Sequence, residues 1–101
     1  MNNDMVVERV KQQFTRMVSL VDDKLVLQVQ LIKHRIHHGE DNIGERHLLD
    51  RIDNAELQIK EHQDGNFNEY KRATPEEMRL IFRTMISLNE ELASSPVSNR
   101  L

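Results

Sequence analysis

The chain of 101 residues contains no cysteine, two prolines, three glycines and only four aromatic residues. Without cysteine it can form neither a disulfide bond nor a thiolate zinc site, and it has no cysteine nucleophile. The glycines are isolated at positions 39, 44 and 65, so there is no glycine-rich loop to bind phosphate. No unbroken apolar run exceeds three residues, as at 25–27, whereas a membrane-spanning helix needs about 18. We therefore expect no membrane span and no active site of these kinds.

Apolar residues make up 38% of the chain and charged residues 31%. A single domain of this size builds a thin core, which small proteins often complete by oligomerisation. The N-terminal stretch MNNDMVVERVKQQF carries charges inside its apolar pattern, unlike a signal peptide. The composition predicts a soluble, cytoplasmic protein that forms a homodimer or a complex with another protein.

The net charge of −3 is unevenly distributed. Residues 1–32 carry four positive and four negative side chains, residues 33–38 add two positive ones, and residues 40–64 carry eight acids against three bases. This is not the strongly basic balance of proteins that bind nucleic-acid phosphates. The acidic segment is a candidate surface for a basic partner, with a merely solvated face as the alternative. Its candidate residues are Asp50, Asp53, Glu56 and Glu61.

Residues 5–38 are predicted to form one long helix, because apolar residues recur in steps of three or four. The average step is about 3.6 residues, which is the repeat of an ordinary α-helix. Further apolar residues flank this stripe and make it wider than a two-helix coiled-coil seam. The helix is therefore expected to contact more than one neighbour. The stripe consists of Val7, Val10, Phe14, Met17, Val21, Leu25, Val29, Ile32 and Ile36.

Two shorter helices are predicted at about 43–63 and 75–93. Gly39 is expected to end the first helix in the left-handed conformation, and Asn42 with Glu45 to open the second as a capping box. Gly44 lowers the helix propensity at this start. The sequence DGN at 64–66 is expected to end the second helix, so that residues 66–73 form a connector.

The third helix has the clearest start signal, TPEE at 74–77, in which Thr74 caps, Pro75 takes the first helical position and Glu77 completes the box. The prediction is an all-α fold, a helical hairpin or three-helix bundle. It forms one helical domain over residues 1–93, followed by a flexible C-terminal tail at 94–101.

At about 1.5 Å per residue, the three helices span roughly 51, 32 and 29 Å. Short connections favour an antiparallel hairpin with the third helix folded back. The two shorter helices are then expected to cover the C-terminal two-thirds of the first. The N-terminal part of the apolar stripe is left for self-association in an α-helical homodimer. The predicted contact residues are Val7, Val10, Phe14 and Met17.

Three of the five histidines lie in the stretch LIKHRIHHGED. His34 and His38 are one helical turn apart and could chelate a metal ion with His47 from the next helix. The positive charges of Lys33 and Arg35 oppose this. Cations in a last turn complement the helix dipole, so we interpret the cluster as a helix terminus. A pH-sensitive cluster is a further alternative. We expect neither a metal site nor a cofactor.

The acid pairs Asp22–Asp23 and Glu76–Glu77 are adjacent in sequence, so on a helix they point about 100° apart and form no catalytic dyad. By elimination, the sequence predicts a small non-enzymatic protein-protein interaction module: an adaptor, a chaperone, or an inhibitor or regulator of a partner protein. The alternative is a nucleic-acid-binding transcriptional regulator that uses the basic end of the first helix.

Overall fold

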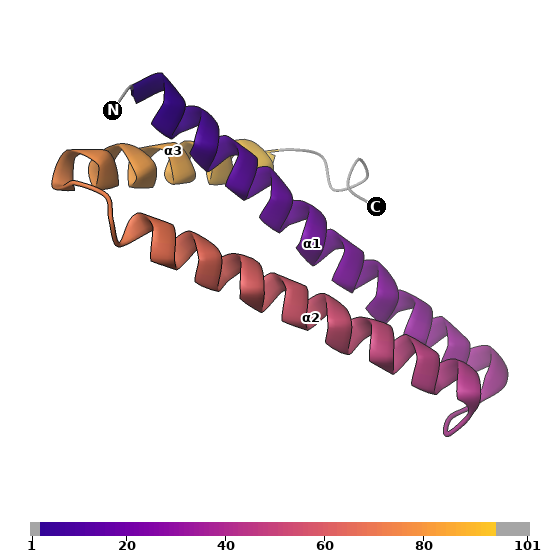
Figure 1. The fold of residues 1–101 in the computed structure, drawn as a ribbon. Helices are drawn as coiled ribbons and strands as arrows, with labels where there is room; N and C mark the ends of the chain where they lie inside the picture. Colours follow the sequence, from indigo (N-terminus) through magenta and orange to yellow (C-terminus); the bar gives the residue numbers. More distant parts are fainter. Residues whose placement is uncertain (1–2, 95–101) are drawn as a thin grey trace.

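The computed structural model describes residues 3–94, and this part of the chain forms three α-helices without a β-strand (Figure 1). Helix α1 spans Asn3–His38, α2 spans Ile43–Tyr70 and α3 spans Pro75–Ser94. The antiparallel helices α1 and α2 form a long hairpin, and α3 lies across the N-terminal half of α1 (Figure 1). The all-helical prediction is confirmed. Of the predicted tail, residues 95–101 lie outside the described part.

The turn between α1 and α2 is built from local hydrogen bonds. Gly39 adopts a φ of +78°, the left-handed conformation predicted for it. The Asn42 side chain accepts from the Glu45 amide at 2.9 Å and donates to the carbonyls of His38 and Gly39 at 3.2 and 3.0 Å. The Asn42 cap is confirmed, but the Glu45 carboxylate accepts from the Asp41 amide at 3.3 Å and not from that of Asn42.

Helix α2 continues to Tyr70, so the prediction that DGN ends it near residue 63 was wrong. Gly65 lies inside the helix, where glycine costs roughly 0.5–1 kcal/mol relative to alanine. Contacts of the last turn with α1 offset this cost. The Tyr70 hydroxyl donates to the Gln13 side chain, and Glu69 pairs with Arg9 at 3.1 Å. The connector therefore shrinks to residues 71–74.

Helix α3 begins at the predicted capping box. The Thr74 amide donates to Glu77 Oε1 at 2.9 Å, and the Glu77 amide donates to Thr74 Oγ1 at 3.1 Å. The hydrogen bond with the Thr74 backbone holds the pKa of Glu77 below its ordinary value. This local signal was sufficient to place the start of the helix.

Within residues 3–94, most of the buried apolar residues fall into two small clusters. Val6 and Val10 of α1 pack with Ile81 of α3 near the N-terminus. Further along the hairpin, Leu27 and Leu31 pack with Ile52 of α2. The prediction that the two shorter helices cover the C-terminal two-thirds of α1 was wrong. Because α2 ends beside the start of α1, the short connector places α3 on the N-terminal half.

The described chain measures 54 × 30 × 15 Å, and its long dimension matches the length of a 36-residue helix, about 54 Å. Over residues 3–94, none of the three helices combines the length and apolar character needed to cross a membrane.

Candidate functional site

The four residues predicted to self-associate are largely covered within the single chain. Val10 is only 1% exposed and packs in the cluster with Ile81 of α3. Val7, Phe14 and Met17 are half-buried. The premise that this part of the stripe stays uncovered is therefore wrong, and Val10 offers no free surface. A role of the other three in self-association stays a prediction.

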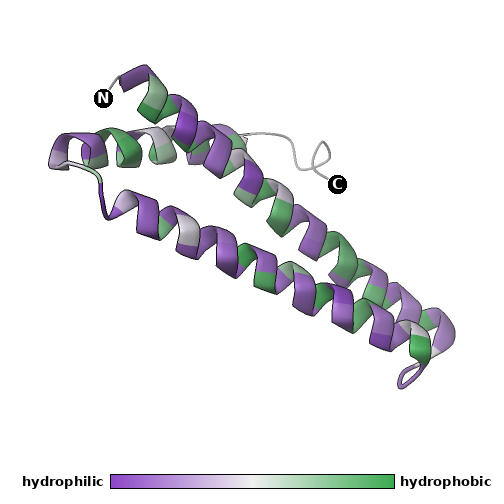
Figure 2. Cartoon of the chain, viewed as in Figure 1, coloured by the Kyte–Doolittle hydropathy of each residue, from purple (hydrophilic) through white to green (hydrophobic). Residues whose placement is uncertain are grey.

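A row of exposed apolar residues lies on the C-terminal half of α1 and is named here the outer face. Its residues follow one another in steps of four, four, three and four, so they share one side of the helix. Their exposed fractions range from 36% at Val21 to 74% at Ile36. In Figure 2, apolar segments continue along α1 beyond the part that α3 crosses. The outer face consists of Val21, Leu25, Val29, Ile32 and Ile36.

The outer face continues the surface on which α3 packs. At about 100° per residue, Phe14 and Val18 lie on the same side of α1 as the outer face. The same two residues share a surface hollow with Leu88 and Leu92 of α3. Helix α3 ends at Ser94. One side of α1 is thus covered by α3 in its first half, and within residues 3–94 no helix covers its second half.

The opposite side of the same half closes the hairpin without help from the outer face. Leu27 and Leu31 bury themselves against Ile52 of α2. Lys24 and Glu56 add an ion pair across the seam, with Nζ 3.4 Å from Oε1. The apolar residues of the outer face are therefore not needed to hold α1 and α2 together.

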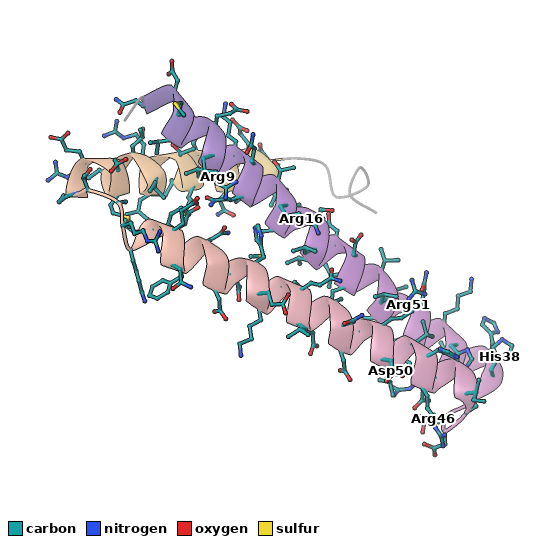
Figure 3. The ribbon with its side chains drawn as sticks, in the orientation of Figure 1. Arg9, Arg16, His38, Arg46, Asp50 and Arg51 are labelled. Carbon is teal, nitrogen blue, oxygen red and sulfur yellow. The ribbon has the colours of Figure 1, made fainter. Side chains whose placement is uncertain are left out.

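The histidines at the turn contact neighbouring side chains. Nε2 of His34 lies 2.6 Å from Asn42 Oδ1, and its ring centroid is 5.0 Å from that of His38. His38 lies at the tip of the hairpin (Figure 3). Among residues 3–94, no three histidine or carboxylate side chains are placed to hold a metal ion, so His34, His38 and His47 are not brought together as ligands. This arrangement favours the helix-terminus interpretation.

The basic end of α1 is partly neutralised. Arg35 Nε lies 3.3 Å from Oε2 of Glu45, whose side chain is only 8% exposed. This hydrogen bond is the main reason that the pKa of Glu45 is held below 4.5, and it raises the pKa of Arg35. Arg35, one of the basic residues at the end of α1, is therefore already paired, which weakens the nucleic-acid-binding alternative.

The acidic residues of α2 do not form a surface of one sign. Glu56 pairs with Lys24 at 3.4 Å. Asp50 lies one helical turn from Arg46 on the outer side of α2, toward its turn end (Figure 3). This mixture favours a solvated face over a docking site for a basic partner. The four candidates are all exposed: Asp50, Asp53, Glu56 and Glu61.

A polar network at the other end of the hairpin was missed by the sequence analysis. Gln13 is 3% exposed and donates through Nε2 to Glu69, while it accepts from the Tyr70 hydroxyl. His62 Nε2 lies 3.1 Å from the Gln13 carbonyl oxygen. Burial, as the first cause, raises the pKa of Tyr70. The network attaches the end of α2 to α1.

The sequence feature that could have predicted this network is a second series of residues within α1, spaced seven apart. The residues at positions 6, 13, 20 and 27 are all buried and recur every seven residues, which is the repeat of a helix-helix seam. Gln13 is the polar member of this series. A polar residue at one such position is a device that fixes which parts of two helices meet.

A recess of about 370 Å³ opens where the start of α1, the end of α2 and the start of α3 meet. Val6, Val10 and Ile81 contribute apolar wall. Several polar residues at its rim are engaged elsewhere, since Arg9 pairs with Glu69, Tyr70 donates to Gln13 and Glu77 belongs to the capping box, while Arg72 also lines the recess. The recess therefore offers mainly apolar contact.

In comparisons with known proteins, the chain matches no family model, no curated protein and no solved structure.

Proposed function

We propose that the protein is a small non-enzymatic helical interaction module, of the adaptor, chaperone or regulator kind, that binds a protein chain through the outer face of α1. The observation that carries this proposal is the row of exposed apolar side chains on the C-terminal half of α1. Val29, Ile32 and Ile36 are 59–74% exposed in succession on one side of the helix.

Two physical arguments support this proposal. A contiguous row of exposed apolar side chains is typical of a binding surface, whereas scattered apolar residues are not. The outer face is also dispensable for the hairpin, whose seam lies on the other side of α1 and is formed by Leu27, Leu31 and Ile52. Exposed apolar residues that lie outside this seam are best explained by contact with another chain.

The test uses the double variant Val29→Gln, Ile32→Gln and a matched control, Leu57→Gln, Ile86→Gln. The control residues are 52% and 60% exposed and lie on α2 and α3, away from the outer face. All three proteins should show the same helix content by circular dichroism. Affinity capture from source-cell extract should recover a protein with the wild type and the control but not with the outer-face variant. Equal capture by all three would contradict the proposal.

A further inference from the structure

Gly65 is a weak point in helix α2, and neither its backbone conformation nor its surroundings require a glycine. Its backbone is helical, and a Cβ added to it would meet no atom within 4 Å. Asp64 and Asn66 on either side are also poor helix formers. Because glycine has the widest choice of backbone conformations, this is the point at which the end of α2 bends most easily.

There is also space beside this glycine. Gly65 and Asn66 border a hollow of about 350 Å³ between α1 and α2, and Gln13 and His62 are among the other residues that line it. One turn further along α2, Tyr70 borders the recess of about 370 Å³ where the three helices meet. Hollows thus lie beside the end of α2 at both of these turns, so few side chains have to move when it bends.

Polar contacts attach the segment after Gly65 to α1. Glu69 and Tyr70 both form hydrogen bonds with the side chain of Gln13, which is 3% exposed. Arg9 adds an ion pair with Glu69, in which the two side chains are 57% and 43% exposed. An exposed ion pair contributes little to stability, so the buried Gln13 supplies most of the polar attachment.

The same segment covers the apolar cluster at the N-terminal end of α1. Tyr70 and Ala73 pack against the cluster of Val6, Val10 and Ile81. Val10 is 1% exposed, and it lines the recess together with Tyr70 and Ala73. If Tyr70 and Ala73 moved away from α1, the recess would widen and Val10 would meet solvent.

We propose that residues 66–74 form a latch, which pivots at Gly65 and is held closed by Gln13. In the closed state the latch covers the apolar cluster around Val10. In the open state the recess widens into an apolar surface that the closed molecule hides. The opening is local, because it separates residues 66–74 from α1 and leaves the seam around Leu31 in place. One buried glutamine thus controls the exposure of a second apolar surface.

Cysteine reactivity tests the latch, because the chain has no cysteine of its own. Val10→Cys places a thiol under the latch. Leu31→Cys places one in the seam at the other end of the hairpin, where the native side chain is 8% exposed. The rate at which each thiol reacts with a small disulfide reagent measures how often its surroundings open. Each is measured alone and combined with a second change at Gln13 or Gly65.

The two second changes should move the rate at Val10→Cys in opposite directions. Gln13→Ala should raise it at least about fivefold, because the latch loses its main attachment. Gly65→Ala should lower it about twofold to fivefold, because alanine favours the straight helix at the pivot. Neither should alter the rate at Leu31→Cys. The exposed neighbour supplies the control, Gln12→Ala, which should leave both rates unchanged.

Tyr70→Phe provides a milder change if Gln13→Ala does not fold. It removes the hydroxyl that donates to Gln13 and keeps the aromatic ring against the apolar cluster. It should raise the rate at Val10→Cys about twofold or more, with helix content unchanged by circular dichroism. Equal changes at Val10→Cys and Leu31→Cys would mean that only unfolding of the whole chain exposes Val10, which overturns the latch. A rate at Val10→Cys that does not respond to Gly65→Ala would overturn the pivot.

Discussion

At the scale of single residues, the contact between Gly44 and His34 constrains the turn most tightly. A Cβ added at Gly44 would lie 2.9 Å from Nε2 of the His34 ring and still closer to Cε1. The ring cannot swing aside without losing its 2.6 Å contact with Asn42. Gly44 looked like a weak point for helix formation in the sequence, and the structure shows it to be the site of a close approach.

Alanine should therefore have opposite effects at the two helical glycines. Gly65→Ala should stabilise the protein by about 0.5–1 kcal/mol, because its Cβ would meet nothing within 4 Å. Gly44→Ala should destabilise it by about 1 kcal/mol or more, because the added methyl overlaps the His34 ring. Urea unfolding followed by circular dichroism measures both. The penalty at Gly44 should disappear in a His34→Ala background, and a stabilising Gly44→Ala would show that no close contact exists.

The ion pair of Glu45 with Arg35 predicts a pH dependence. Because the pKa of Glu45 is lowered from 4.5 in the folded state, its charge stabilises the fold above that pH and loses its effect as the pH falls through the lower folded value. Glu45→Gln should melt several degrees below the wild type at neutral pH, with a smaller difference in acid. Thermal unfolding across this range measures it. The exposed Glu61→Gln is the control and should melt like the wild type throughout.

At the scale of the helices, the end of α2 is held by Gln13. The variant Gln13→Ala removes the partner of the Tyr70 hydroxyl and one partner of Glu69. It should cost about 1–3 kcal/mol and selectively speed amide exchange at residues 66–70, while residues 46–60 keep their protection. Hydrogen exchange measured by NMR separates the two segments. The neighbouring exposed residue supplies the control, Gln12→Ala, and unchanged exchange at 66–70 would count against the role of Gln13.

The sequence was sufficient for features that depend on neighbouring residues. The caps at Asn42 and Thr74 are formed by side chains that reach a backbone amide three residues away, so the motif contains the whole interaction. The end of α2 was not predictable in this way. Gly65 favours termination locally, but contacts of Glu69 and Tyr70 with a helix more than 50 residues earlier override it.

The position of α3 along α1 depends on even more distant information. The apolar stripe of α1 continues from Val7 to Ile36, so it offers α3 packing partners along its whole length. Which half is covered follows from where α2 ends, and the error in the end of α2 therefore placed α3 on the wrong half of α1. The seven-residue series through Gln13 was the sequence feature that could have corrected both the predicted end of α2 and the predicted position of α3.

At the scale of the whole molecule, the placement of α3 gives the two ends of the hairpin different numbers of packed helices. Near the N-terminus of α1, three helices share a cluster around Val10, whereas the end at the turn consists of two helices with a seam around Leu31. Segments with fewer buried contacts unfold locally more often, so the two-helix end should open transiently more often than the three-helix end. The outer face lies on this looser end. A chain that docks there would not only cover apolar surface but also hold shut the part of the protein most prone to open.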